Sequence, residues 1–252
     1  MTAEAELDRE IQIAHEIQMS TLPGFMPSVP GYDFAGRFWP TDRTGGDTFD
    51  VVSIDPEHIF VLLGDATGHG IGPALSALQV QSMFRVALRL GADLDDAFKH
   101  VNDQMVEDLP EGRFVTAVFG LLNTPENMFR FHSAGQGPIL HYQHATDECE
   151  WFEPTHFPMG FLELEELQES QYLHMAPGDI LALITDGIYE YENKLKEQFG
   201  MARVGELVRA NKNLPMTELM ELLKVEAQAF GGDAPQLDDI TVVLIQRLPE
   251  TG

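Results

Sequence analysis

The sequence predicts one mixed α+β domain that combines hairpin-connected strands with amphipathic helices. Short turns join apolar runs of strand length at 49–54 with 58–65 and at 114–122 with 128–133, which is the pattern of β-hairpins. Helices are expected at 3–21, 73–90, 94–109, 201–210 and 216–230. No internal repeat or clear linker follows residue 24, so a single domain accounts for the 252 residues.

The remaining strands are shorter or come later in the chain. They are expected at 32–39, 139–142, 150–152, 172–174, 180–185 and 240–245. Two polar stretches, 163–169 and 189–197, are predicted to be loops.

The chain is strongly acidic, with 41 acidic residues, 15 basic residues and a formal net charge of −26. This charge can serve solubility or adaptation to salt, but it would also repel nucleic acid and anionic lipid. No apolar run approaches the roughly 20 residues that span a bilayer. We therefore expect neither a nucleic-acid partner nor a membrane partner. The absence of a signal peptide and the single cysteine, Cys149, indicate a cytoplasmic protein.

The first predicted helix carries an apolar stripe and ends at Leu22-Pro23-Gly24. The residues at helical spacing are Leu7, Ile11, Ala14, Ile17 and Met19. Such a stripe can pack on its own domain, which is the commoner case. It can also pair with a second copy of the chain, or continue a helix from an upstream sensor domain.

The stretch 58–75 organises the candidate site. A strand-like run, 59–63, leads to Asp65, and glycines at 64, 68, 70 and 72 precede Pro73, where a helix is expected to begin. Glycines allow the backbone to pass close to a small ligand, and a helix N-terminus favours an anion nearby. On this stretch alone, a tight turn with an Asp cap is an equally good interpretation.

Three other carboxylates repeat this arrangement. Asp47 follows two glycines and leads into a strand, Asp186 follows the apolar strand 180–185, and Asp238 precedes the last strand. The hairpin formed by 49–54 and 58–65 would bring Asp47 and Asp65 to the same end of adjacent strands. Each aspartate taken singly is more often a turn or cap residue, and the repetition is what favours a shared site.

Four unpaired carboxylates at one sheet edge would repel one another unless cations lie between them. Oxygen donors without a Cys or His cluster favour Mg²⁺ or Mn²⁺ over structural zinc. Two such ions roughly 3.5–4 Å apart can hold a phosphate and activate a water molecule for in-line attack.

The motifs together resemble the metal-dependent (PPM-type) Ser/Thr protein phosphatases, and especially their bacterial branch, typified by the sporulation stage II E and stress-response sigma-regulating phosphatases. The motifs are Gly45-Gly46-Asp47, Gly64-Asp65-Ala66-Thr67-Gly68-His69-Gly70, Thr185-Asp186-Gly187 and Asp238-Asp239-Ile240-Thr241. Ala14, Gln18 and Leu22-Pro23 resemble the entry helix of that branch, and Phe114-Val115-Thr116 and Phe199-Gly200 resemble its minor motifs. The likeness covers nearly the whole chain.

The resemblance implies an αββα four-layer sandwich, with two mainly antiparallel sheets between helix pairs. It also implies a centre of two Mn²⁺ or Mg²⁺ ions. Asp65 would bridge the ions, and the Ala66 carbonyl would bind one of them. Asp186 and Asp238 would hold the other, with Asp47 a ligand directly or through water.

Three positions depart from the family pattern or have two interpretations. His69, four residues after Asp65, would either protonate the leaving serine oxygen or hold the glycine turn. Gln136 stands where the branch usually has His, and an amide can keep a structural role but no acid–base role. Arg43 would contact the substrate phosphate or pair with a neighbouring carboxylate.

The resemblance implies a phosphoserine/phosphothreonine protein phosphatase in bacterial signalling. Its substrate would be a phosphorylated anti-sigma-factor antagonist of the STAS type. Residues 1–24 would form a regulatory or linker helix behind a sensor or receiver module, with homodimerisation through this helix as a further expectation, and residues 25–252 would form the phosphatase domain. The alternatives are a catalytically silent, phosphatase-shaped adaptor and a metal-dependent phosphodiesterase or nuclease, which the lack of a basic surface disfavours.

Overall fold

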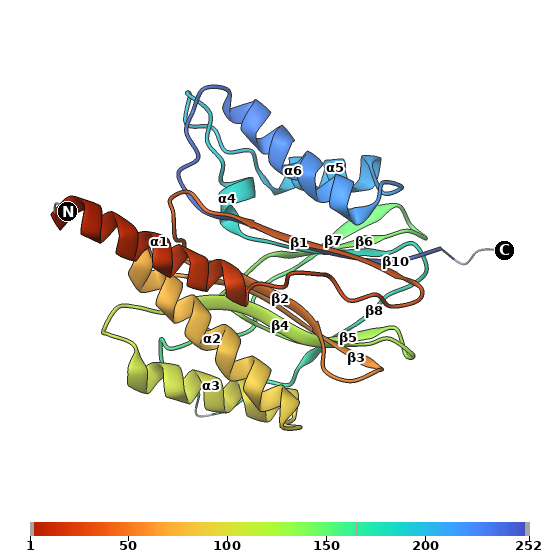
Figure 1. Ribbon diagram of the computed structural model, residues 1–252. Helices are drawn as coiled ribbons and strands as arrows, with labels where there is room; N and C mark the ends of the chain where they lie inside the picture. The colour runs from red at the N-terminus through yellow and green to blue at the C-terminus, as the bar shows by residue number, and fades with distance from the viewer. Residues whose placement is uncertain (1–2, 165, 250–252) are drawn as a thin grey trace.

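The computed structural model describes residues 3–164 and 166–249 and forms a four-layer sandwich (Figure 1). One sheet has the strand order β1-β10-β9-β6-β7 and the other β2-β3-β4-β5-β8. Every pairing between these strands is antiparallel. Helices α5 and α6 cover the first sheet and α2 and α3 cover the second. The predicted αββα fold is therefore confirmed.

The elements follow the predicted order with small changes at their ends. The strands are β1 (Tyr32–Trp39), β2 (Asp47–Ser53), β3 (His58–Ala66), β4 (Val115–Asn123), β5 (Met128–Ala134), β6 (Ile139–Gln143), β7 (Glu148–Phe152), β8 (Gln171–His174), β9 (Ile180–Ile184) and β10 (Ile240–Arg247). The helices are α1 (Ala3–Thr21), α2 (Ile71–Arg89), α3 (Leu94–Asp108), α4 (Asp186–Tyr189), α5 (Met201–Ala210) and α6 (Met216–Gly231).

Strand β3 shows why its sequence is apolar without alternation. Ile59, Val61 and Leu63 point into the core between the two sheets, while Phe60 and Leu62 point into the core beneath α2 and α3. Successive strand side chains face opposite sides, so a strand covered on both faces needs apolar residues at every position. This double burial fixes the strand that ends in Asp65.

The predicted β2–β3 hairpin forms, and its register sets the geometry of the site. Asp47 lies directly opposite Asp65, and Thr116 of β4 lies opposite Asp65 on the other edge of β3. The prediction that the hairpin would bring Asp47 and Asp65 to one end of adjacent strands is confirmed.

Three regions differ from the prediction. Asp186 begins a one-turn helix, α4, which is too short to leave a periodic signal in the sequence. The segment 189–197 is a loop for most of its length, but Tyr191 within it is buried. In the predicted loop 163–169, Leu164 is buried and residue 165 lies outside the described residues.

Helix α1 lies beside α2 and is attached mainly by polar contacts (Figure 1). Arg85 of α2 donates from Nη2 to the Thr21 carbonyl at 2.9 Å, and Gln18 is buried. Leu7 is 57% exposed, and Ile17 and Met19 are also exposed. The commoner case, in which the whole stripe packs on its own domain, is therefore wrong for these three residues, because the buried side of the helix centres on Gln18.

None of the helices in the described part of the chain combines the length and the apolar character needed to cross a membrane.

Candidate metal and phosphate centre

Four of the predicted metal-binding aspartates lie around one end of the sandwich. Asp47 begins β2, Asp65 is the penultimate residue of β3, Asp186 follows β9, and Asp238 precedes β10. Thr185, next to Asp186, and Thr241, three residues after Asp238, both donate hydrogen bonds to Asp47. The structure thus places the four aspartates at strand ends on the same side of the two sheets, and their joint binding of metal stays a prediction.

Asp65 has a higher carboxyl pKa than Asp186, the other aspartate of the group whose raised pKa has a defined value. Burial, followed by the charges of Asp186, Asp238 and Asp239, raises the pKa of its carboxyl to about 7. Burial and the charge of Asp238 likewise raise the pKa of Asp186 to about 6. Groups with such shifts mark sites where charge has been gathered at a cost in stability.

Asp47 is buried and connects the two sheets. Its Oδ2 accepts hydrogen bonds from Thr185 Oγ1 at 2.8 Å and from Thr241 Oγ1 at 2.6 Å. Burial and the charges of Asp65 and Asp239 raise the pKa of Asp47 well above its ordinary value. The two hydroxyls belong to the opposite sheet, so they fix the carboxylate in place from across the sandwich.

Asp239 holds the loop that carries Asp47. Its two carboxylate oxygens accept from the backbone N–H groups of Thr41 and Gly46, each at 2.7 Å. Its side chain is buried, whereas that of Asp238 is exposed. Asp239 therefore stabilises the loop, whereas Asp238 faces outward beside Asp186.

Gly46 is required by a close approach of two backbone segments. A Cβ at this position would lie 2.4 Å from the carbonyl oxygen of Ala66, well inside van der Waals contact. The Ala66 N–H donates back to the Gly46 carbonyl at 3.0 Å. The glycine thus lets the loop before β2 hold the end of β3, where the Ala66 carbonyl is the predicted backbone ligand.

The donor chemistry of this centre fits a hard divalent cation. The leading causes of the pKa shifts of Asp47, Asp65 and Asp186 are burial and other carboxylates, and no Lys or Arg in the described part of the chain forms an ion pair with any of the three. Negative charge gathered without a protein cation is the setting in which Mg²⁺ or Mn²⁺ binds. Among the described residues, no three His, Cys, Asp or Glu side chains already surround a common point closely enough to hold an ion, so the fit rests on donor type and charge.

The two predicted non-metal residues lie in different surroundings. His69 is exposed on the glycine turn after β3, where it lines a shallow pocket together with Thr67 and Arg113. Arg43 pairs with Asp8 of α1 at 2.6 Å. Of the two interpretations of Arg43, the structure therefore shows the ion pair, and phosphate contact stays a prediction.

Gln136 keeps a structural role, without the acid–base chemistry of a histidine. Its Oε1 accepts from Thr116 Oγ1 at 2.8 Å, and the same hydroxyl lies 3.3 Å from the Asp65 carbonyl oxygen. Ser133 Oγ donates to the Gln136 carbonyl. The amide thus supports the strand pair that carries Asp65.

Gln18 contacts the loop before β2, and the sequence alone did not predict this contact. Its Nε2 donates to the Gly45 carbonyl at 2.8 Å, and its Oε1 accepts from the Gly45 N–H at 3.3 Å. Helix α1 is therefore bound to the loop that leads to Asp47. A single Gln on a helix does not by itself predict a contact with a distant loop. The only indication in the sequence was that Gln18 belongs to the motif that resembles the entry helix.

Comparisons with known proteins agree with this geometry. The family model for stage II sporulation protein E (SpoIIE) matches residues 55–248. The chain is 23% identical to the phosphoserine phosphatase RsbU of Bacillus subtilis, over 96% of this chain and 71% of that protein. It is 22% identical to the protein IcfG of Synechocystis sp., over 94% of this chain. The chain spans 41% of IcfG and 57% of a third relative, the phosphoserine phosphatase RsbP of Bacillus subtilis.

Solved structures show the same fold. The SiaA-PP2C domain of Pseudomonas aeruginosa matches with a TM-score of 0.82 and 20% identity, over 97% of each chain. A structure of the PP2C phosphatase domain of SpoIIE from Bacillus subtilis, with a fragment of its regulatory domain, matches with a TM-score of 0.73 and 16% identity. It covers 85% of this chain and 63% of that one. The chain belongs to the SpoIIE family, in the SpoIIE/RsbU branch of the PPM-type protein serine/threonine phosphatases.

Proposed function

We propose that this chain is a metal-dependent phosphoserine/phosphothreonine protein phosphatase. The observation that carries the proposal is the group of carboxylates at the end of the sandwich: the charges of Asp186 and Asp238 raise the pKa of Asp65, and among the described residues no Lys or Arg forms an ion pair with Asp65 or Asp186. Phosphoryl transfer by bound water needs such a centre and little else from the protein. Membership of the SpoIIE family supports the same reaction.

The residues would divide the work as follows. Asp65 and the Ala66 carbonyl from one sheet, and Asp186 and Asp238 from the other, would hold two Mn²⁺ or Mg²⁺ ions. Asp47 would bind directly or through water. Divalent cations held there supply charge for the phosphate oxygens and activate water.

The remaining groups position or protonate. Thr185 and Thr241 hold the Asp47 carboxylate by hydrogen bonds, so that it does not swing when substrate arrives. His69 is the candidate donor of a proton to the leaving seryl oxygen, and its exposure on the turn supports that role.

We propose a phosphorylated STAS-type antagonist in the cytoplasm as the substrate. The phosphoserine phosphatases RsbU and RsbP are relatives over 96% and 94% of this chain, and a solved relative from Mycobacterium tuberculosis contains RsbU and RsbW domains in one protein. These relatives support a protein substrate within such a signalling system.

We also propose that residues 1–24 regulate the domain formed by 25–252. The hydrogen bonds from Gln18 to Gly45 give α1 a direct route to the Asp47 loop. The exposed Leu7, Ile13 and Ile17 of α1 offer an apolar face for a second copy or an upstream sensor module. Replacing Leu7 and Ile11 with Ser should change turnover or oligomeric state, and unchanged values for both would remove the regulatory role.

The first experiment is Mn²⁺-dependent phosphate release from a phosphoserine peptide. Wild type is compared with Asp65→Asn and Asp186→Asn, and with Asp233→Asn as a matched control, because Asp233 is exposed and pairs with Lys194 away from these carboxylates. The proposal expects turnover that requires Mn²⁺ and is lost in both site variants but kept in the control. Metal binding with no turnover would indicate a domain held inactive by α1. Neither binding nor turnover would favour the silent adaptor.

A further inference from the structure

We propose that Phe114, Phe157 and Phe161 form a docking ridge that binds an apolar and basic segment of the phosphoprotein substrate beside the catalytic turn. This inference rests on the proposed phosphatase function and names a specificity surface for it. The ridge and its neighbouring pocket lie outside the group of carboxylates described above.

Phe161 contacts both other rings; Phe157 and Phe161 face solvent, and Phe114 is half-buried. The ring centroids of Phe114 and Phe161 are 5.9 Å apart, and those of Phe157 and Phe161 are 6.0 Å apart. Phe157 is 61% exposed and Phe161 56% exposed. Contiguous exposed aromatic surface costs solubility and commonly marks a binding site. These rings are therefore candidates for anchors that become buried when a partner binds.

The backbone beneath the ridge is held rigidly despite the exposure of its side chains. Met159 exchanges two hydrogen bonds with Val115 of β4, at 2.8 and 2.9 Å. Asn102 of α3 accepts from the Gly160 N–H at 3.1 Å and donates to the Leu162 carbonyl at 3.0 Å. A surface fixed before binding loses little conformational entropy when the partner arrives. Rigid backbone under exposed rings is the opposite of what a mobile surface loop shows.

The ridge continues directly from the catalytic turn. Thr67, two residues after Asp65, donates from its N–H and its hydroxyl to the Phe114 carbonyl at 3.1 and 2.8 Å. The Phe114 N–H donates back to the Thr67 hydroxyl at 2.9 Å. Val115 of β4 pairs with Ala66 of β3 on one side and forms an isolated β-bridge with Met159 on the other, so Met159 lies about 10 Å from Ala66 at ordinary strand spacing. A protein segment on either side of a phosphoserine can span that distance.

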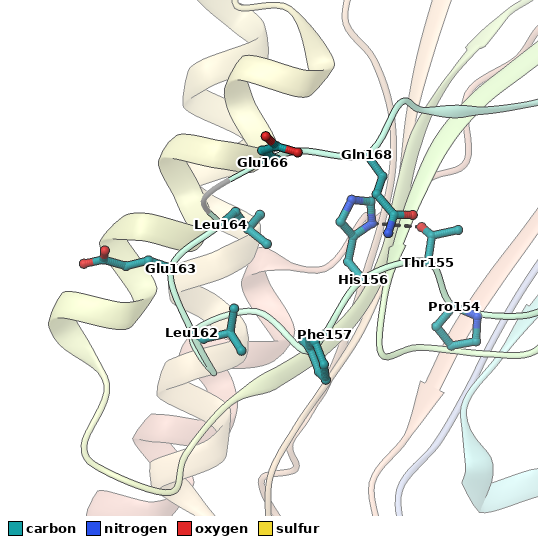
Figure 2. Close-up of a pocket in the computed structure, with 9 residues that line it drawn as sticks. All are labelled: Pro154, Thr155, His156, Phe157, Leu162, Glu163, Leu164, Glu166 and Gln168. Atoms are coloured by element: carbon teal, nitrogen blue, oxygen red, sulfur yellow. Dashed lines mark hydrogen bonds between the residues drawn. The ribbon is translucent and has the colours of Figure 1, made fainter.

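A pocket of about 640 Å³ opens beside Phe157, and its residues indicate the chemistry of the occupant. Figure 2 shows His156 on one side of it, and Leu162 and Leu164 with Glu163 and Glu166 on the other. Glu163 and Glu166 are exposed, and none of the described residues that line the pocket is Lys or Arg. An apolar surface with an acidic rim fits a segment that carries large apolar side chains next to Lys or Arg. We therefore assign the ridge to such a segment of the substrate rather than to a second copy of this acidic chain.

The test uses three substrates and two double variants. The substrates are p-nitrophenyl phosphate, a phosphoserine peptide flanked by Leu and Arg, and the same peptide with Glu in place of Arg. The ridge variant is Phe157→Ser with Phe161→Ser, and its control is Phe25→Ser, a 94% exposed Phe outside the ridge. The rim variant is Glu163→Gln with Glu166→Gln, and its control is Glu206→Gln with Glu218→Gln, exposed acids of α5 and α6.

The ridge variant should lower kcat/KM for the Leu/Arg peptide about tenfold through KM, as removal of aromatic anchors does. Its kcat/KM for p-nitrophenyl phosphate should stay within about twofold of wild type, because that substrate cannot reach the ridge. The rim variant should lose the preference for Arg over Glu and the salt dependence of that preference. Both control variants should behave as wild type.

A binding measurement separates failure of the ridge from failure of the proposed function. The fluorescent Leu/Arg phosphopeptide is titrated against Asp65→Asn protein with and without the ridge substitutions, so that no turnover is needed. Weaker binding in the ridge variant supports docking even if the wild type proves inactive. Three results would overturn the inference: unchanged peptide binding and kcat/KM, a parallel loss of p-nitrophenyl phosphate turnover, or a ridge-dependent change from dimer to monomer.

Discussion

Asp93 and Asp95, at the start of α3, form ion pairs with Arg130, whereas Asp47, Asp65 and Asp186, at the end of the sandwich, form none with any Lys or Arg that the structure describes. Arg130 pairs with Asp93 at 2.8 Å and with Asp95 at 2.7 Å. The Asp93 pKa is lowered, chiefly by its hydrogen bonds from Arg130. Burial alone would raise the pKa of Asp95, but hydrogen bonds from Ser170 and His132 and the charge of Arg130 bring it below its ordinary value.

The difference separates carboxylates that stabilise the fold from carboxylates that are available for chemistry. In the α3 cluster, each negative charge is matched by hydrogen bonds that favour the ionised form. We call Asp47, Asp65 and Asp186 the acidic centre. In it, burial and like charges favour the protonated form of Asp65 and Asp186. A cation from solution can relieve the repulsion among Asp47, Asp65 and Asp186, so this group can bind a cation. Asp93 and Asp95 are already neutralised by Arg130 and do not need one.

The largest expected effect is stabilisation of the acidic centre by metal. Mn²⁺ at about 100 times its Kd should raise the free energy of unfolding of wild type by about 2.7 kcal/mol. Asp65→Asn should lose this gain in stability, because the centre then lacks the carboxylate that is proposed to bind both ions. Urea unfolding with Mn²⁺ or with chelator measures both values. An equal gain in both proteins would place the metal elsewhere.

Removing Arg130 from its pairs with Asp93 and Asp95 should change the free energy of unfolding by a similar amount, and this effect does not require metal. Arg130→Gln leaves Asp93 and Asp95 without their partner, and we expect a loss of about 2–3 kcal/mol in the free energy of unfolding. The matched control is Arg37→Gln, which breaks an exposed pair with Glu221 and should cost less than about 1 kcal/mol. Equal losses for the two variants would erase the contrast between the clusters.

The two clusters should respond to pH in opposite directions. Asp93 and Asp95 have lowered pKa values in the folded protein, so their contribution is present above their ordinary pKa and is lost as pH falls through the lower folded values. Asp65 and Asp186 have folded pKa values of about 7 and about 6. Their folded state binds protons more tightly than the unfolded state, so metal-free stability should fall as pH rises from about 4 to about 7.

The difference between wild type and Asp65→Asn isolates this term, since the rest of the acidic surface titrates alike in both proteins. Thermal unfolding in chelator across pH 3–8 should show the wild-type Tm falling relative to the variant above about pH 4. Parallel curves would contradict the assignment of shared charge to Asp65.

The smallest expected effect concerns the exposed pair of Arg43 with Asp8. Both side chains are about half exposed, so Arg43→Ala should change the free energy of unfolding by no more than about 0.5 kcal/mol. KM for a phosphoserine peptide is measured on the same variant. A marked rise in KM without a loss of stability would establish the predicted phosphate contact.

Sequence reasoning could reach what depends on local pattern. The turn between β2 and β3 and the continuous apolar run of β3 fix which ends of the strands meet, so the placement of Asp47 and Asp65 at the same end was predictable, whereas the register that sets them directly opposite each other came from the structure. The family motifs supplied the sandwich itself. The single-turn α4 was not predictable, because four residues carry no periodicity.

Contacts made across layers could not be read from the chain. Thr185 and Thr241 reach Asp47 only because two separate sheets pack face to face, and no spacing in the sequence encodes that distance. The apolar stripe of α1 was a poor guide, since the buried contact is made by Gln18, a residue that hydrophobic periodicity scores as surface.

Strand β3 is buried on both faces and paired on both edges, whereas Asp238 lies on an exposed loop before β10. Amide hydrogens exchange with solvent only when the local structure opens. The amides of β3 should therefore be among the last to exchange, and those of residues 232–238 among the first. The candidate site therefore joins a strand whose amides should exchange only on global unfolding to a loop whose amides should exchange from the native state.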